Sequence, residues 1–192
     1  HSNREAVASL AEELDRDGVR TLIVQGDLSQ RAGPAAVCRE VLSALGRVDI
    51  LVNNAGSWVD KPLLDTTDDE WDRLLHTDLR ATYLMIRGLA PGMVQRRWGR
   101  IVNMSSVASL NYVPGEGLYG IAKAGINHLT KSFGVELALH GVTVNAVAPA
   151  WTVPHDQPFP QPEDFPQCAD APNKRPGHAD EVAALVHYLA SD

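Results

Sequence analysis

Short, mainly apolar runs alternate along this chain with longer segments of helical periodicity. The runs are rich in β-branched residues and lie at residues 21–25, 48–52, 100–104 and 142–147. Strands that are apolar on both faces are typical of parallel sheets covered by helices on either side. Because helices are predicted between these strands, we expect an α/β fold with a doubly wound, Rossmann-like parallel sheet.

Helices are predicted where apolar residues recur every three or four positions. In the first of them, Val7, Leu10 and Leu14 share one face. The predicted helices span residues 4–16, 33–45, 68–96, 117–140 and 179–190. A Pro-rich stretch over residues 154–176 is too long for an ordinary connection, and it suits either a binding loop or a mobile surface loop. The length of 192 residues favours a single domain.

Charge and composition disfavour several classes of protein. The net charge of -7 at pH 7 argues against a nucleic-acid partner, because phosphate backbones bind basic surfaces. The sequence contains no apolar run long enough for a bilayer and opens on polar residues, so we expect no membrane association and a cytoplasmic location. Cys38 and Cys168 are expected to be reduced thiols, although a disulfide between them is formally allowed. The His and Cys spacings match no zinc site, so no metal is expected.

Tyr119 and Lys123 form the strongest chemical signal in the sequence. They lie four residues apart on a predicted helix, so both side chains point to the same side, one turn apart. A cation beside a phenol favours the phenolate, so Lys123 is expected to lower the pKa of Tyr119 toward the working pH. Such a tyrosine can act as a general acid or base on a carbonyl or alcohol oxygen. Taken alone, the pair is more often packing plus a solvated charge.

Polar residues also follow three of the predicted strands. Ser106 follows the third strand, at the edge where doubly wound sheets bind ligands, and its hydroxyl can hydrogen-bond a developing oxyanion. A capping role is the simpler alternative for Ser106, and we expect that role for Ser105. Asn53–Gly56 suit either the close approach of a flat ligand or a plain turn. Asp27 could accept a hydrogen bond from an adenine amino group, or it could be the N-cap of the next helix.

Taken together, four motifs resemble the short-chain dehydrogenase/reductase family. They are Asn53–Gly56, Asn103–Ser106, the Tyr119 and Lys123 pair, and Val144–Pro149. Ser106 precedes Tyr119 by thirteen residues, which is the family's spacing. The entry to the last predicted helix, from Arg175, is similar as well. The resemblance covers essentially the whole chain and is closest to the 3-oxoacyl-carrier-protein reductase and glucose dehydrogenase types.

This resemblance implies hydride transfer between a nicotinamide cofactor and a small carbonyl or alcohol substrate. Tyr119 would donate or accept the proton, Lys123 would lower its pKa and bind the nicotinamide ribose, and Ser106 would hold the substrate oxygen. Tyr119 and Lys123 would also contact the cofactor. The other residues implied in cofactor binding would flank the adenine, line the cleft or meet the nicotinamide: Asp27 and Leu28; Asn54, Ala55 and Gly56; Pro149 and Thr152.

The sequence departs from the family at both ends. The family's first strand, its T-G-x-x-x-G-x-G turn, the next helix, the second strand and the last strand have no counterpart here. That turn and the following helix N-terminus hold the cofactor pyrophosphate. We therefore expect an internal fragment that folds poorly and binds the cofactor weakly. The strand at residues 21–25 is expected to lack an adjacent partner.

Other departures concern the site itself. Asp78 occupies the position of a family asparagine that helps hold a water in a proton relay, and an ionised aspartate accepts a hydrogen bond but cannot donate one. We count Asp78 among the catalytic residues and expect an altered pH profile. Ala150, where the family usually has glycine, either crowds the nicotinamide or has no effect. Ser2 and Arg4 suit a ribose 2′-phosphate, so NADP(H) is favoured over NAD(H) as the cofactor.

The leading prediction is thus an oxidoreductase that acts on a carbonyl or alcohol. The alternative is a catalytically silent fragment or a binding member of the same family, which the missing phosphate turn and Asp78 favour. A nucleotide-sugar epimerase or dehydratase is less favoured, because the segment after Pro149 is short. In the family, the helices at residues 68–96 and 117–140 pair subunits, so a homodimer or homotetramer is expected.

Overall fold

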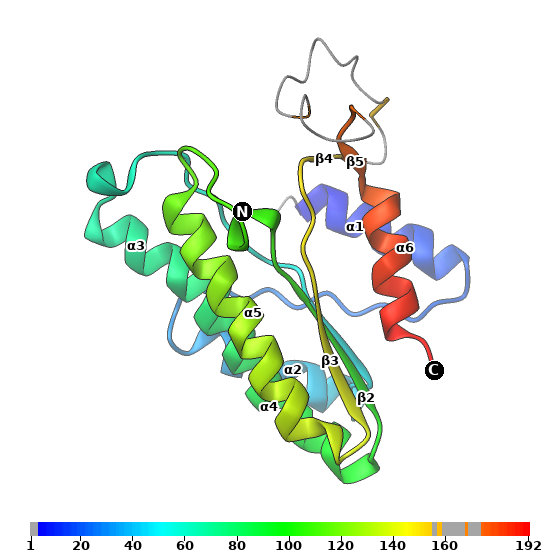
Figure 1. Ribbon diagram of the computed structural model, residues 1–192. Helices are drawn as coiled ribbons and strands as arrows, with labels where there is room; N and C mark the ends of the chain where they lie inside the picture. Colours follow the sequence, from blue (N-terminus) through cyan, green and yellow to red (C-terminus); the bar gives the residue numbers. More distant parts are fainter. Residues whose placement is uncertain (1–3, 155–156, 159–167, 169–173) are drawn as a thin grey trace.

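A computed structural model of the chain describes residues 4–154, 157–158, 168 and 174–192 (Figure 1). Its centre is a parallel sheet that contains, in the described part of the chain, three strands in the order β1-β2-β3. These are β1 (Ile50–Asn53), β2 (Gly99–Met104) and β3 (Val142–Val147). Ile50 pairs with Arg100, and Gly99 pairs with Val142. The predicted parallel α/β fold is confirmed.

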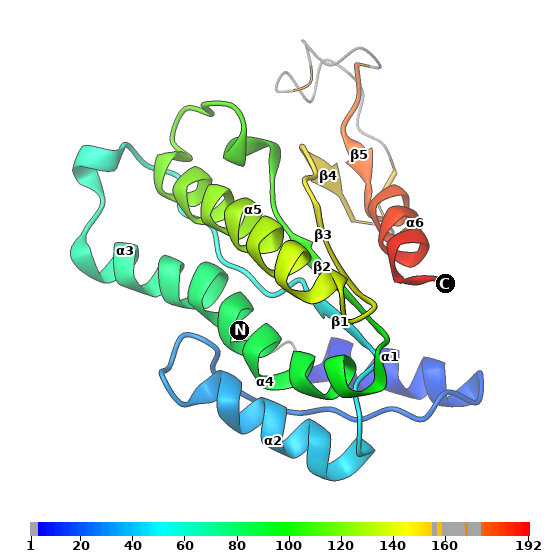
Figure 2. The ribbon, with the colours of Figure 1, turned by 60° about the horizontal axis from the view of Figure 1, so that its bottom comes forward.

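Helices cover both faces of this sheet. Three of them, α2 (Gly33–Leu45), α4 (Ala81–Arg96) and α5 (Gly117–Ala138), lie on one side, and α6 (Ala179–Ala190) lies on the other (Figure 2). The central strand β2 supplies the most buried part of the core, because both of its faces are covered. The main apolar cluster joins β-strand residues to α2 and α4: Cys38, Leu51, Ile86, Leu89, Ala90, Met93, Ile101 and Val142.

The predicted long helix over residues 68–96 is interrupted, so that prediction was wrong in its middle. The structure has α3 (Asp68–Leu75), then η2 (His76–Arg80), a π-helical turn, and then α4. A π-helical turn places one extra residue in the helix and is frequent at functional sites. Here it contains Asp78, whose side chain is fully buried and points toward the sheet edge. Apolar periodicity alone does not distinguish such a turn from a continuous helix.

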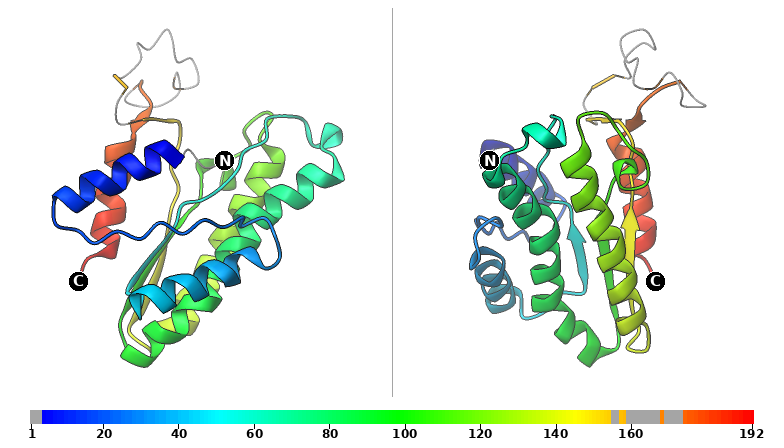
Figure 3. Two further views of the ribbon diagram at one scale, coloured as in Figure 1. Left: turned by 180° about the vertical axis from the view of Figure 1, so that it is seen from behind. Right: turned by 60° about the vertical axis from the view of Figure 1, so that its left-hand side comes forward.

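The predicted strand at residues 21–25 is not a strand in the structure. The segment is extended but pairs with no described strand, and Ile23 is 54% exposed. None of the residues described in α1 (Arg4–Arg16) is buried, so its apolar face, with Val7 and Leu10, is open to solvent (Figure 3). An apolar run can satisfy its backbone groups as a strand only beside a partner. The lack of an adjacent partner was expected for this run.

The remaining elements are short. They include two 3-10 turns, η1 (Leu63–Asp65) and η3 (Val107–Ser109). The strands β4 (Thr152–Val153) and β5 (Gly177–His178) pair in parallel and bring together the two ends of the Pro-rich stretch, whose other residues lie largely outside the described part. Cys38 and Cys168 are both free thiols, as expected. Among the described residues, no helix combines the length and apolar character needed to cross a membrane.

Candidate active site

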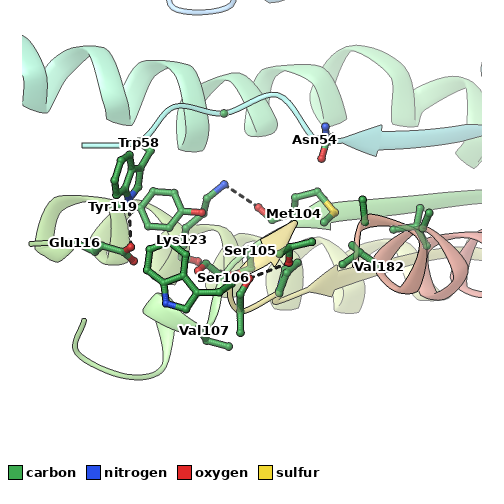
Figure 4. Close-up of a pocket in the computed structure, with 18 of the residues that line it drawn as sticks. Asn54, Trp58, Met104, Ser105, Ser106, Val107, Glu116, Tyr119, Lys123 and Val182 are labelled. Carbon is green, nitrogen blue, oxygen red and sulfur yellow. Dashed lines mark hydrogen bonds between the residues drawn. The ribbon is translucent and has the colours of Figure 1, made fainter. Parts of the chain in front are cut away.

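A cleft of about 890 Å³ opens at the carboxyl ends of the three sheet strands. This volume lies within the range of small-molecule sites in proteins. Its walls come from the segment after β1, the end of β2 with η3, the start of α5, the segment after β3, and α6 (Figure 4). Ser106, Tyr119 and Lys123 all line it. The expectation that the strand ends form the ligand edge therefore agrees with the position of the cleft.

Lys123 is held firmly beneath Tyr119. Its side chain is only 5% exposed, and its Nζ donates a hydrogen bond to the Met104 carbonyl oxygen at 3.0 Å. The same Nζ lies 5.3 Å from the centre of the Tyr119 ring. Both residues share a face of α5, as the four-residue spacing predicted, so the phenol and the ammonium are neighbours in space.

Asp78 forms a buried ion pair with this lysine. Its Oδ2 lies 3.0 Å from Lys123 Nζ, and both side chains are almost completely buried. The other oxygen, Oδ1, accepts hydrogen bonds from the Ser57 backbone N–H at 2.7 Å and from the Ser57 hydroxyl at 3.1 Å. Within the described residues, Oδ2 has this ionic partner but no hydrogen-bond donor. The carboxylate therefore compensates the lysine charge at the floor of the site.

Gly56 lets the backbone pass close to this ion pair. A Cβ atom there would lie 2.8 Å from Asp78 Oδ2 and 3.4 Å from Lys123 Nζ. Contacts this short would push the pair apart, so any larger residue would disturb it. The requirement for glycine here arises from close approach, as expected for a small residue at a strand end.

The pKa of Tyr119 corrects one prediction from the sequence. Burial raises the pKa of the phenol, and the hydroxyl of Ser106 lowers it through a hydrogen bond. The carboxylates of Asp78 and Glu116 raise it further. The expected lowering by Lys123 was wrong in its net effect, because desolvation dominates and Asp78 lies beside the ammonium.

Ser106 has the capping role that the sequence offered as the simpler alternative. Its Oγ accepts a hydrogen bond from the Ala108 backbone N–H at 3.2 Å, which caps η3. Ser106 also lines the cleft. Ser105 was expected to be the capping serine, but its hydroxyl instead donates to the Lys123 carbonyl oxygen within α5 at 3.2 Å.

Asn53 and Asn103 hold the strand ends together and do not line the cleft. The Asn53 Nδ2 donates to the Asn103 Oδ1 at 2.8 Å, and the Asn103 Nδ2 donates to the Thr130 Oγ1 at 2.9 Å. This chain of hydrogen bonds links β1, β2 and α5. Asn103 is fully buried, so it fixes the relative position of the three elements that carry the site.

Comparisons with known proteins agree with this geometry. A family model described as enoyl-(acyl carrier protein) reductase matches residues 1–192. The nodulation protein G of Azospirillum brasilense is 36% identical over 192 residues, covering 99% of this chain and 78% of that protein. A 3-oxoacyl-[acyl-carrier-protein] reductase FabG of Staphylococcus aureus (strain Mu50) is likewise 36% identical, with the same coverage. The chain belongs to the short-chain dehydrogenase/reductase family.

Solved structures support the same assignment. The acetoin dehydrogenase YohF of Salmonella typhimurium matches with a TM-score of 0.91 and 33% identity, covering 100% of this chain and 77% of that one. The acetoin dehydrogenase of Enterobacter cloacae matches with a TM-score of 0.88 and 32% identity. The chain spans 77% and 76% of the lengths of these two structures, and its sheet is the Rossmann type that they share.

The short-chain dehydrogenase fold brings together part of the predicted cofactor set. Asn54, Gly56, Pro149 and Thr152 line the cleft, together with Tyr119 and Lys123. Ala150 lines it as well, in the position where the family usually has glycine. Lys123 Nζ donates one hydrogen bond, to the Met104 carbonyl oxygen, and forms an ion pair with Asp78 at 3.0 Å.

Other predicted cofactor residues lie away from this cleft or outside the description. Ala55, Asp27 and Leu28 are not among the described residues that line it. The Asp27 carboxylate accepts hydrogen bonds from the Ser29 backbone N–H at 3.0 Å and from the Ser29 hydroxyl at 2.6 Å. These bonds lower the pKa of Asp27. Ser2 lies outside the described residues, so its assigned contact with the cofactor stays a prediction.

Sequence reasoning missed several residues of the site. Glu116 and Trp58 lie side by side on the cleft wall, and α6 adds apolar residues to the lining (Figure 4). Glu116 precedes Tyr119 by three residues, so its closeness in sequence could have suggested it. Trp58 follows β1 in an irregular segment and carries no periodic signal. Trp151 also lines the cleft.

Proposed function

We propose that this protein is a nicotinamide-dependent oxidoreductase that transfers hydride between NAD(P)(H) and a small carbonyl or alcohol substrate. The proposal rests on one observation above all: Ser106, Tyr119 and Lys123 meet on the wall of a single cleft at the carboxyl ends of the sheet strands. Membership of a family of dehydrogenases and reductases supports the same reaction class.

Tyr119 is the proposed proton donor in the direction of reduction. When bound, the reduced nicotinamide supplies a hydride, two electrons and a proton, to the carbonyl carbon. As the new C–H bond forms, the π pair of the C=O bond moves onto the oxygen, which takes the phenolic proton of Tyr119. Burial raises the pKa of this phenol, so it is protonated near neutral pH and available as the proton donor.

Ser106 and Lys123 assist at the two sides of the phenol. The Ser106 hydroxyl donates a hydrogen bond to the substrate oxygen, whose charge grows during the reaction. The Lys123 ammonium donates a hydrogen bond to the nicotinamide ribose. Asp78 acts as a positioning residue that holds the Lys123 ammonium against Met104. We infer that Asp78 also alters the pH profile of proton transfer, as its charge predicts.

NADP(H) is the proposed cofactor, with NAD(H) as the alternative. The proposal rests on the absence of an acidic residue before Glu5 and on Arg4. The Arg4 guanidinium donates to the Gln25 side chain at 2.8 Å in an exposed position, so it can exchange this partner for a phosphate. A comparison of kcat/KM with NADPH and with NADH tests the choice, and a higher value with NADH would contradict it.

A homodimer or homotetramer is proposed, together with a cytoplasmic location as a prediction from the sequence. The assembly is supported by apolar side chains on the outer face of α5: Val135 is 79% exposed and Leu139 is 82% exposed. Large apolar groups gathered on one helix face are a feature of subunit interfaces.

The alternative function is a catalytically silent binding member of the family. Asp78, which occupies the position of a family asparagine and pairs with Lys123, is the observation in its favour. A silent member would bind a ligand in the cleft without turning it over. Binding of NADPH, followed by its fluorescence, separates this alternative from the oxidoreductase when activity is measured on the same sample.

Removal of the Tyr119 hydroxyl tests the proposed reaction. Tyr119→Phe is expected to lower kcat by about 10²- to 10⁴-fold, the usual contribution of a general acid or base. The measurement is the oxidation of NADPH at 340 nm with a panel of small ketones and aldehydes. Tyr112→Phe, at a tyrosine that is 81% exposed, is the matched control and is expected to leave kcat unchanged. Equal activity of Tyr119→Phe and the unmodified protein would contradict the proposal.

A further inference from the structure

Glu116 occupies a helix N-cap position without capping the helix. It immediately precedes α5, and its side chain accepts no hydrogen bond from the first turn. A carboxylate at this position ordinarily binds the free N–H groups there and is stabilised by the helix dipole. Instead, its Oε1 accepts a hydrogen bond from the Trp58 indole N–H at 3.3 Å, across the cleft wall (Figure 4). The carboxylate is thus turned toward the cleft.

Glu116 and the reacting phenol line the same cleft. Glu116 is the N-cap residue of α5 and precedes Tyr119 by three residues. Trp58 and Val113 line this cleft as well. The Glu116 carboxylate is one of the groups that raise the pKa of Tyr119. A substrate in the cleft can therefore contact both Tyr119 and Glu116.

The negative charge of Glu116 has no cationic partner among the described residues. Lys123 is the one ammonium group that lines the described cleft, and Asp78 already lies 3.0 Å from it. The groups that act on Tyr119 are Asp78 on η2, Ser106 after β2 and Glu116 just before α5, and the Lys123 ammonium lies 5.3 Å from its ring. The indole of Trp58 donates a hydrogen bond to Glu116, and His187 of α6 is a further titratable group that lines the cleft. Because one carboxylate is left over, the substrate end of the cleft is negative.

We propose that Glu116 selects uncharged substrates that carry a hydroxyl group close to the reacting carbonyl. The carboxylate accepts the hydrogen bond of that hydroxyl, while Trp58 and Val113 contact the hydrocarbon part. Oxo acids are disfavoured, because their carboxylate approaches Glu116 with a like charge. This inference rests on the proposed oxidoreductase function and names the substrate class of the same site.

Three substrates that differ only at one carbon test the selection. 1-Hydroxy-2-butanone carries a hydroxyl, 2-butanone carries a hydrogen, and 2-oxobutanoate carries a carboxylate group in place of the terminal CH₂OH. We expect kcat/KM to fall in that order, with about a tenfold or larger decrease at each step, because a charge-assisted hydrogen bond and a like-charge contact each change affinity on this scale. The reduction is followed as NADPH oxidation.

Glu116→Gln removes the charge and keeps the shape. We expect it to raise kcat/KM for 2-oxobutanoate by about tenfold and to lower it for 1-hydroxy-2-butanone, with little change for 2-butanone. The alkaline limb of the pH profile is expected to move to lower pH, because loss of the carboxylate lowers the pKa of Tyr119. Glu136→Gln, at an exposed glutamate of the same helix, is the matched control and leaves all three values unchanged.

A second measurement needs no variant and avoids any effect on folding. Salt screens exposed charges, so raising the ionic strength from 0.01 to 1 M is expected to increase kcat/KM for 2-oxobutanoate relative to 2-butanone in the unmodified protein. Unchanged substrate ratios in Glu116→Gln and at high salt, with reduction of all three compounds, would overturn this inference and leave the oxidoreductase function intact. Failure to reduce any carbonyl compound while NADPH binds would overturn the proposed function instead.

Discussion

Lys123 has two partners at the floor of the site, and its relation to Asp78 decides the charge there. The sequence placed Lys123 beside Tyr119 through the geometry of a single helix turn. The resemblance to the family implied that the Asp78 charge lies near Lys123, but the direct ion pair at 3.0 Å is set by packing, because the two residues are 45 positions apart and belong to different helices. The chemistry at this scale therefore depends on a contact that no local pattern predicts.

Asp78→Asn is expected to shift the pH dependence of reduction to lower pH. The Asp78 carboxylate raises the pKa of Tyr119, so its neutralisation lowers that pKa. Reduction needs the protonated phenol and declines as pH rises through this pKa, so the alkaline limb of kcat against pH moves toward neutral pH in the variant. Asp72→Asn, at an exposed aspartate on α3, is the control and keeps the limb in place.

The same substitution also tests the structural role of the ion pair. Removal of one partner leaves the other charge buried, which destabilises proteins by about 3–5 kcal/mol. Asp78→Asn is therefore expected to lower the melting temperature, while Asp72→Asn does not. An unchanged pH profile would show that the charge at position 78 does not reach the phenol, whatever the effect on stability.

At the scale of elements, the bounds of the helices were predicted more accurately than the break within one helix or the pairing of the strands. The predicted ranges over residues 33–45 and 179–190 agree with α2 and α6, because caps and apolar periodicity are local properties. The π-helical turn at His76–Arg80 was not predicted, since it preserves the apolar pattern on both sides. The run at residues 21–25 has a strand's composition, but a strand also needs a neighbour.

The start of α3 is stabilised by a reciprocal cap. The Thr67 hydroxyl accepts a hydrogen bond from the Glu70 backbone N–H at 3.3 Å, and Glu70 Oε2 accepts one from the Thr67 backbone N–H at 2.9 Å. The ammonium of Lys61, 2.8 Å from Glu70, helps to lower the pKa of this carboxyl to about 2. Because this value is below the ordinary 4.5, the stabilisation is complete above pH 4.5 and is lost as pH falls toward 2.

Thr67→Ala is expected to lower the free energy of unfolding by about 1 kcal/mol at pH 7, the usual contribution of an N-cap threonine. The measurement is urea unfolding followed by circular dichroism. The neighbouring Thr66→Ala variant keeps the capping box and is expected to be less destabilised. Equal losses in the two variants would mean that the cap contributes nothing beyond ordinary packing.

At the scale of the whole molecule, the apolar strands explain why helices cover both faces of the sheet. Assembly of subunits depends instead on the apolar side chains that remain exposed on the surface. Val135 lies on the outer face of α5, one turn from Leu139. If subunits pair through this face, Val135→Glu would place a buried, unpaired charge in the interface and produce monomers. Light scattering of the unmodified protein is expected to give the mass of a dimer or tetramer.

The control for assembly is another exposed apolar residue. Leu64 on η1 is 99% exposed, so Leu64→Glu is expected to leave the mass unchanged. A monomeric mass for the unmodified protein at tens of micromolar would contradict the proposed assembly. A mass that falls equally in both variants would point to general loss of structure rather than to a specific interface.

The sequence alone determined the parallel α/β class, most helix bounds and the shared face of Tyr119 and Lys123, because these depend on backbone geometry and on periodicity over a few residues. Only the tertiary structure decided the charge environment: Asp78 beside Lys123, Glu116 facing the cleft, and the raised pKa of Tyr119. Burial and electrostatic fields depend on groups brought together from distant segments, and their distances are set by packing.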